Sequence, residues 1–169
     1  MTHEILHTLV FDYRDFESHN SLAEFWTKDA KCVEEQTRKT CETFPTVTCD
    51  TKETFEEDAA DLAAYRIVWN LYKKAYIRKT VVEKYEDLDK KQLFFYGAAV
   101  VFCSPNGMEK YSYHDTNHSN VYQRVNSLMS QMDGFSEAFK CKPSDRMVRN
   151  RARTCELYGS KAERKRKLG

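Results

Sequence analysis

The first seven residues carry a pattern whose spacing has a chemical meaning on a helix. His3 and His7 enclose Glu4 in the arrangement H-E-x-x-H. Four residues make about one helical turn, so both imidazoles would project from one face and reach a single metal ion. Glu4 would then lie beside the open coordination position of that metal, where a carboxylate acts as a general base. The pattern therefore predicts a helix with a zinc site on one of its faces.

A second pattern, of carboxylates, offers the third ligand that such a site needs. Glu57 and Asp61 are four residues apart, and Ala59 and Ala60 between them favour a helix. The two acids would share a face, so that Glu57 binds the metal while Asp61 hydrogen-bonds a ligand histidine. Either pattern alone is compatible with a solvated helix face. Their combination favours the metal site.

The composition is typical of one globular domain. The 169 residues, 41% hydrophobic and 13% aromatic, are enough for a packed core. The formal net charge of +1 gives no electrostatic reason to expect nucleic acid or a membrane surface as a partner. No apolar run reaches the roughly 18 to 20 residues that span a bilayer. We expect no nucleic-acid partner and no membrane segment in this chain.

Apolar residues recur at helical spacing along much of the chain. Helices are expected over 2–9, 22–43, 53–79, 93–102 and 135–139. Pro45 closes the second of these helices. Asp89 and Gln92 resemble a capping box before the fourth. The segment 104–120 is expected to be a loop, and the fold class is mainly α with little sheet.

The cysteines point to an oxidising compartment. The chain has six, and no two of them form a C-x-x-C pair. Scattered cysteines of this number are typical of disulfides, and a thiolate zinc site is not expected. A polar Thr2 follows Met1, so this chain has no secretory signal. Together these features suggest the C-terminal part of a secreted or surface protein whose start is missing.

Further landmarks follow the two metal patterns in a fixed order. They are Arg14 with Phe16, Trp26-Thr27, Gln92-Leu93-Phe94-Phe95, Cys103, His118-Ser119, Arg124-Val125-Asn126 and Phe135 to Cys141, with Cys155 last. With Glu57-Asp58-Ala59-Ala60-Asp61, this series resembles the neprilysin and endothelin-converting-enzyme family of zinc endopeptidases. The resemblance implies the C-terminal part of a gluzincin (thermolysin-like) catalytic domain over 1–158. The basic run near the end of the chain predicts a disordered tail over 159–169.

The resemblance also implies a role for each site residue. The implied ligands of one zinc ion are His3, His7 and Glu57. Glu4 would accept the proton of the attacking water. His118 and Arg124 would hydrogen-bond the substrate carbonyl and stabilise the charge that develops on it. Asp61 would orient His3, and proton donation has also been assigned to this aspartate in such enzymes.

Other expectations follow from the same resemblance. The resemblance implies a disulfide between Cys41 and Cys155. Cys32 and Cys49 have no counterpart in the family pattern and could bond to each other. Short peptides would be the substrates, with cleavage before hydrophobic residues. The location would be extracellular or at the cell surface, and full-length relatives are often membrane-anchored.

The chain also departs from the family pattern. Val10 stands where an aspartate would orient His7, and Glu56 replaces a glycine. Family members are several times longer, so the partners of Cys103 and Cys141 and a substrate-binding segment would lie in the missing part. A zinc endopeptidase is the first prediction. The alternatives are a catalytically silent remnant, which keeps zinc or acts only as a binding partner, and an unrelated zinc-binding module.

Overall fold

The structure, a computed structural model, describes residues 2–7, 21–45, 49, 54–77, 84–85, 87–103 and 117–157. Some sequence expectations lie outside this part. They concern Val10, the landmarks Arg14 and Phe16, most of the expected loop over 104–120, and the boundary between 1–158 and the tail 159–169.

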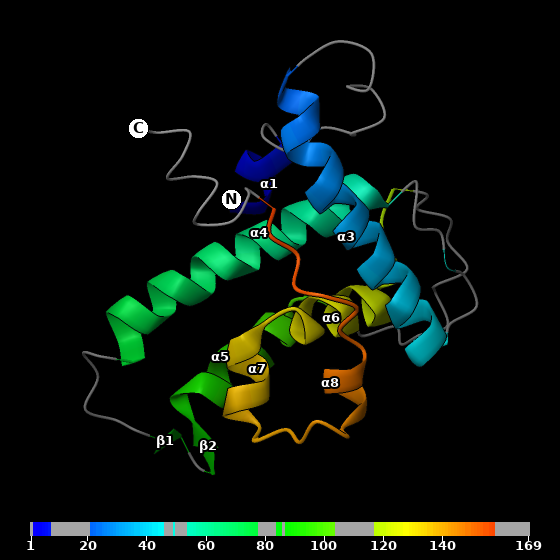
Figure 1. Ribbon diagram of the computed structural model, residues 1–169. Coiled ribbons are helices and arrows are strands. Elements are labelled where there is room, and N and C mark those ends of the chain that lie inside the picture. The colour runs from blue at the N-terminus through cyan, green and yellow to red at the C-terminus, as the bar shows by residue number, and fades with distance from the viewer. Residues whose placement is uncertain are drawn as a thin grey trace.

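Helices dominate the described part, and the mainly α fold class is confirmed (Figure 1). The elements are α1 (Thr2–His7), α3 (Ser21–Thr43), α4 (Phe55–Tyr72) with the π-helical turn η1 (Lys73–Ile77), β1 (Lys84–Tyr85), β2 (Leu88–Asp89), α5 (Lys90–Val100), α6 (Val121–Ser130), α7 (Asp133–Ala138) and α8 (Arg146–Arg149). The strands form one short antiparallel pair, with Lys84 opposite Asp89. None of the helices in this part combines the length and the apolar content of a membrane span.

Helix α4 is the centre of the fold. It runs through the middle of the molecule, with α1 on one side and α5 and α7 on the other, and α3 crosses its first half towards α6 (Figure 1). Its first half is buried nearly all round, through Phe55, Ala59, Ala60, Leu62, Ala63 and Ala64. Alanine favours the helix and lets neighbouring backbones approach closely. Side chains near the start of α4 therefore lie within reach of α1, α3 and α6, which all pack against it.

Capping side chains set the start of two helices. Asp89 accepts a hydrogen bond from the Gln92 backbone over 2.9 Å, and the Gln92 side chain accepts one from the Asp89 backbone over 3.0 Å. The capping box is thus confirmed. Asn120 caps α6 in a similar way, accepting from the backbone N–H of Tyr122 over 2.9 Å. Helix α6 was not predicted from the sequence, although this helix carries the landmark residue Arg124.

An aromatic core joins α4, α5 and α7. Trp69 packs against Phe94 and Phe95, with ring centroids 4.8 and 5.0 Å apart respectively. Gly134 lets α7 approach this core, because a Cβ atom there would lie 2.5 Å from a carbon of the Trp69 ring. Tyr65 links the same helices at their surface by donating from its hydroxyl to the Ala98 carbonyl over 3.1 Å.

The disulfides differ from those implied by the resemblance. Cys155 bonds to Cys32, and Cys41 bonds to Cys49. Cys41 lies nine residues after Cys32 on α3, which is about 13 Å along a helix axis, so Cys155 cannot reach both. The Cα atoms of Cys32 and Cys155 are 5.4 Å apart, within the range of a disulfide. The Cys41–Cys155 prediction is therefore wrong, and so is the Cys32–Cys49 pair.

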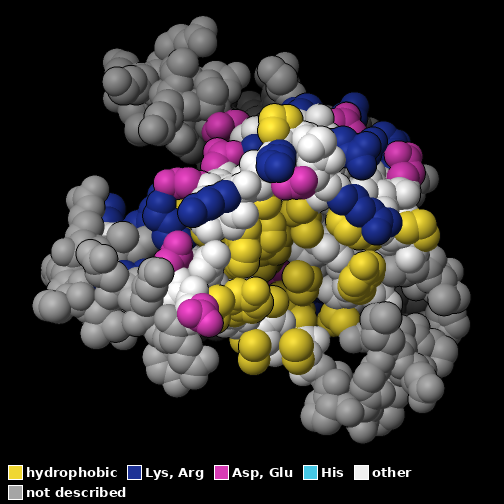
Figure 2. Space-filling model, turned by 90° about the horizontal axis from the view of Figure 1, so that it is seen from below, with side chains coloured by type: hydrophobic (Ala, Val, Ile, Leu, Met, Phe, Trp, Pro, Cys, Tyr) yellow, Lys and Arg dark blue, Asp and Glu magenta, His cyan; other side chains and the backbone are white. Residues whose placement is uncertain are grey.

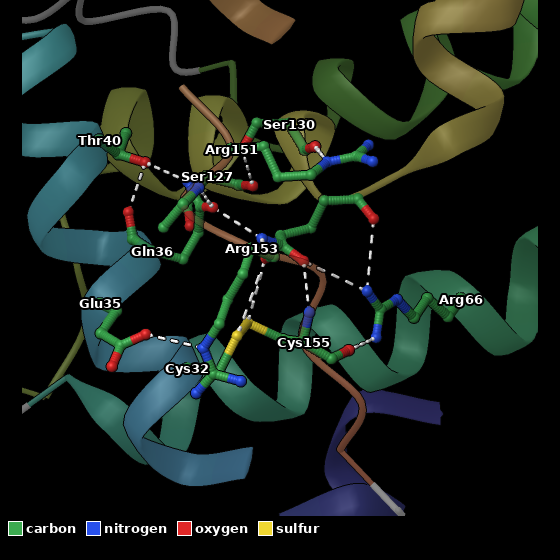
Figure 3. The surroundings of a disulfide bond; sticks show 12 residues. Cys32, Glu35, Gln36, Thr40, Arg66, Ser127, Ser130, Arg151, Arg153 and Cys155 are labelled. Atoms are coloured by element: carbon green, nitrogen blue, oxygen red, sulfur yellow. Dashed lines mark hydrogen bonds and ion pairs between the residues drawn. A yellow bond between two sulfur atoms is a disulfide. The ribbon is translucent and has the colours of Figure 1, made fainter. Parts of the chain in front are cut away.

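A buried polar network explains this choice of partner (Figure 3). Gln131 follows α6, and its side chain donates to Gln36 Oε1 on α3 over 2.6 Å. The Gln131 Oε1 atom accepts from the Cys155 backbone N–H over 3.0 Å. Arg66 on α4 donates to the Cys155 carbonyl. These bonds place the C-terminal segment across α3 at the level of Cys32.

Part of the surface is apolar. Figure 2 shows hydrophobic side chains gathered over the middle of one face. Large exposed hydrophobic residues on α4 and α5 include Ile67, Val68, Leu71, Tyr96, Val100 and Val101. Cys103 and Cys141 are free thiols, and Cys103 is exposed.

Candidate metal centre

Two helices bring the three expected ligands together. His3 and His7 lie one turn apart on α1, and Glu57 lies in the first turn of α4. The two Nε2 atoms are 2.9 Å apart, and Glu57 Oε2 is 3.0 Å from His3 Nε2. Glu57 Oε1 is 3.3 Å from His7 Nε2. Among the described residues these three are the cluster whose donor atoms could hold one metal ion.

The geometry of this cluster fits zinc. Ligand bonds of about 2.0–2.1 Å in a tetrahedral site hold neighbouring donor atoms about 3.3 Å apart. The observed separations of 2.9, 3.0 and 3.3 Å are close to that value. Two imidazole nitrogens and a carboxylate are ligands that zinc prefers, and they leave a fourth position open. The residues present therefore suit the ion.

Asp61 lies beside one of the two ring nitrogens of His3. Its Oδ1 atom lies 2.8 Å from His3 Nδ1. A hydrogen bond there places the proton of the neutral imidazole on Nδ1, so that Nε2 carries a lone pair. That lone pair faces Glu57 Oε2, and two acceptors at 3.0 Å repel each other unless a positive charge lies between them. A metal ion would supply that charge.

Arg124 is the second partner of Asp61. Its Nε atom donates to Asp61 Oδ2 over 2.7 Å, and its side chain is 13% exposed. Burial works against the charge of the guanidinium, but the hydrogen bond and the charge of Asp61 outweigh it and raise the pKa of Arg124. An arginine has five N–H donors, so this contact is compatible with a further contact to a substrate.

His118 also reaches the cluster. Its Nε2 atom lies 3.0 Å from Glu57 Oε2, and its side chain is 35% exposed. The family resemblance implies that this imidazole faces a substrate carbonyl. In the structure it lies beside the expected metal ligand Glu57, close enough to contact a molecule bound there. Glu4 is exposed on α1, next to His3.

A buried carboxylate next to Glu57 was missed by sequence reasoning. Asp58 Oδ2 accepts hydrogen bonds from the hydroxyls of Thr37 (2.8 Å), Thr54 (3.2 Å) and Ser119 (2.8 Å). Burial raises the pKa of Asp58 to about 6, against the lowering effect of the bonds from Thr37 and Ser119. No local pattern reveals this site, because Thr37 and Ser119 are 21 and 61 residues away in sequence.

An apolar pocket adjoins the cluster. It has a volume of about 480 Å³ and lies between α1, α4 and α5. His3 forms part of its wall, together with Tyr65, Val68 and Phe94. A ligand at the metal centre could therefore place an apolar group against α4 and α5.

Several known proteins are similar in sequence to this chain. The model of peptidase family M13 matches residues 1–155. Neprilysin-3 of Drosophila melanogaster is 28% identical over 94% of the chain, and Neprilysin-1 of Caenorhabditis elegans is 26% identical over 92%. Endothelin-converting enzyme 1 of Cavia porcellus is 29% identical over 92%.

The matched region is a small part of each relative. The chain spans 21% of the first of these proteins and 22% of the other two. No solved structure matches the chain significantly.

Proposed function

Because the chain belongs to peptidase family M13, we propose that it is a zinc endopeptidase that hydrolyses peptide bonds in short peptides. The family is zinc-dependent. The observation that carries the proposal is the convergence of His3, His7 and Glu57, whose donor atoms all lie within 4.8 Å of one another. One zinc ion would be held by these three residues.

The surrounding residues have the chemistry that hydrolysis needs. When bound, zinc supplies Lewis acidity, which polarises a carbonyl and makes water a better nucleophile. Glu4 would accept the proton of the attacking water. His118 and Arg124 would donate hydrogen bonds to the carbonyl oxygen as negative charge develops on it. Asp61 would keep His3 in the tautomer that leaves Nε2 free to bind the metal.

The pocket beside His3 supports a preference among peptides. Its lining includes Val68, Leu93, Phe94 and Val101, which are apolar. A hydrophobic side chain next to the cleaved bond would bury apolar surface there and gain binding free energy. We expect peptides with such a residue to be cleaved faster than peptides with a charged residue at the same position.

Zinc content tests the metal site. The purified chain is expected to hold one zinc ion per molecule, and His7→Ala is expected to lose it because one of three protein ligands is removed. Absence of zinc from the unsubstituted chain, after incubation with excess zinc and removal of the free ion, would contradict the proposal.

Turnover tests catalysis separately. A fluorogenic peptide with a hydrophobic residue after the cleaved bond is expected to be hydrolysed by the zinc-loaded chain. Glu4→Gln removes the proton acceptor but no metal ligand, so it should abolish turnover and leave zinc content unchanged. Turnover that survives Glu4→Gln would show that Glu4 is not the base.

A catalytically silent zinc protein is the second candidate. One observation favours it: His118 and Arg124 both contact carboxylates of α4. Bound zinc without turnover would support this function. An extracellular or cell-surface location is proposed for either function, because the two disulfides are typical of oxidising compartments.

A further inference from the structure

His118 and its neighbour Ser119 contact two consecutive residues of α4. His118 Nε2 lies 3.0 Å from Glu57 Oε2. The Ser119 hydroxyl donates to Asp58 Oδ2 over 2.8 Å. Consecutive side chains of a helix project about 100° apart, so these contacts hold the segment 117–120 to α4 from two directions. The segment cannot slide along α4 without breaking one of them.

The contact between Ser119 and Asp58 is the more buried of the two. These residues are 5% and 8% exposed, whereas the His118 side chain is 35% exposed. Asp58 is itself fixed by the hydroxyls of Thr37 on α3 and Thr54 at the start of α4. Because water competes little for a buried hydrogen bond, Ser119 is the anchored end of the segment. His118 is the end that can meet a ligand.

The anchored segment leads directly into α6. Asn120 caps this helix by accepting from the Tyr122 backbone N–H over 2.9 Å. One turn later, Arg124 donates to Asp61. The stretch that carries both candidate donors to a substrate carbonyl is therefore tied to α4 at its beginning by Asp58 and further on by Asp61.

We infer that Asp58 is a positioning residue, which holds the His118 imidazole at the metal centre through the Ser119 hydroxyl. The inference rests on the proposed function for what His118 does to a substrate, but the position of the imidazole can be observed without turnover. Displacing a catalytic group by about 1 Å can cost on the order of 10²-fold in rate. Loss of the anchor should therefore affect both the position of His118 and the kinetics.

The main experiment compares two hydroxyl deletions in the zinc-loaded full chain. Thr37→Val is the matched control for Ser119→Ala, because Thr37 also donates to Asp58 Oδ2 over 2.8 Å but comes from α3. NMR spectra of chains with labelled histidine report the His118 ring, which is assigned with His118→Ala. Ser119→Ala should shift the His118 resonances and lower kcat/KM about 10²-fold. Thr37→Val should leave the resonances in place.

Substitutions of Asp58 provide the rescue test. Asp58→Asn keeps an oxygen acceptor of the same shape, so the His118 resonances should stay close to their original positions. Asp58→Ala removes the nearer of the two acceptors of the Ser119 hydroxyl, the other being Thr54 Oγ1 at 3.0 Å, and should displace them. The double variant Ser119→Ala/His118→Ala should have a kcat/KM within about twofold of that of His118→Ala alone. The reason is that Ser119 acts through the His118 imidazole, which this variant lacks.

Several outcomes would overturn the inference. One is that the His118 resonances do not shift in Ser119→Ala. Another is that they shift equally in Thr37→Val. A third is that Ser119→Ala and His118→Ala lower kcat/KM independently of each other. A wild-type chain without turnover would contradict the proposed function alone, since the resonances still report where His118 lies. If Ser119→Ala does not fold, Ser119→Cys takes its place, because a thiol is a weaker donor of similar size.

Discussion

Asp61 uses both of its oxygens in the candidate site. One lies 2.8 Å from His3 Nδ1, and the other accepts from Arg124 Nε over 2.7 Å. We propose that the first contact makes His3 a better ligand by fixing its tautomer, while the second keeps a positive charge beside the carboxylate. The aspartate therefore links the expected metal ligand to a residue on another helix, although it does not itself belong to the ligand cluster.

Removing this carboxylate should weaken metal binding. Asp61→Ala is expected to lower zinc affinity by about 10–100-fold, because His3 loses the partner that orients its ring. The affinity is measured by competition with a chromogenic chelator, on protein shown to be folded by circular dichroism. Asp133→Ala is the control, because Asp133 forms an ion pair with Arg151 but its side chain is 84% exposed. Equal affinity of Asp61→Ala and the control would refute the orienting role.

For single residues, the sequence predicts which side chains share a helix face when they lie close together in the chain. His3 with His7, and Glu57 with Asp61, could be assigned to shared helix faces because each pair is four residues apart. Their convergence is seen in the structure, but their roles in catalysis remain predictions. The environment of Asp58 could not be foreseen, because its partners come from distant segments that only the packed fold brings together.

Among the secondary structure elements, α7 approaches α4 more closely than an ordinary side chain would permit. A Cβ on Gly134 would lie 2.5 Å from the Trp69 ring, whereas nothing lies within 4 Å of a Cβ on Gly97 in α5. Trp69 is 6% exposed and is surrounded by other aromatic rings, so it has little room to move. The two glycines thus play different physical roles in helices that share one core.

The same glycine-to-alanine substitution should change the free energy of unfolding in opposite directions at these two positions. Gly134→Ala is expected to lower the free energy of unfolding by about 1–3 kcal/mol through overpacking. Gly97→Ala should raise it by about 0.5–1 kcal/mol, because alanine loses less backbone entropy in a helix. Urea denaturation measures both. A stabilised Gly134→Ala variant would mean that α7 can move away from Trp69 at little cost.

The long helices could be predicted from the sequence, whereas the short helix α6 was missed. The expected boundaries of the helix over 22–43 differ from those of α3 by one residue, and the capping box at Asp89 is confirmed. Helix α6 is only ten residues long and buries polar residues, among them Gln123 and Asn126. Val121, Val125 and Leu128 do recur at helical spacing, so the signal for this helix was present but was confined to a short segment next to the expected loop.

For the molecule as a whole, the Cys32–Cys155 bond closes a loop that contains most of the described residues. Its sequence separation is 123, against 8 for Cys41–Cys49. The resemblance implied a different partner for Cys155. The correct one depends on where the C-terminal segment crosses α3, and Gln131 and Gln36 determine this from distant parts of the sequence.

The longer loop should contribute more stability. In the chain-entropy description, breaking Cys32–Cys155 costs about 4–5 kcal/mol and breaking Cys41–Cys49 about 2.5 kcal/mol. Paired alanine substitutions are compared by urea denaturation, in a background where Cys103 and Cys141 are serine so that thiols cannot exchange. A larger loss from the short loop would show that strain or residual structure, and not loop length, determines the contribution.

Helix α1 has six residues, too few for a stable helix in water by itself. It is held by Leu6 in the core and by two histidines facing Glu57. A zinc ion shared by His7 and Glu57 would close a loop of about 50 residues, as a removable cross-link does. Chelation would then release the N-terminal helix as well as empty the site, and an added protease would detect the difference as faster cleavage within residues 2–7.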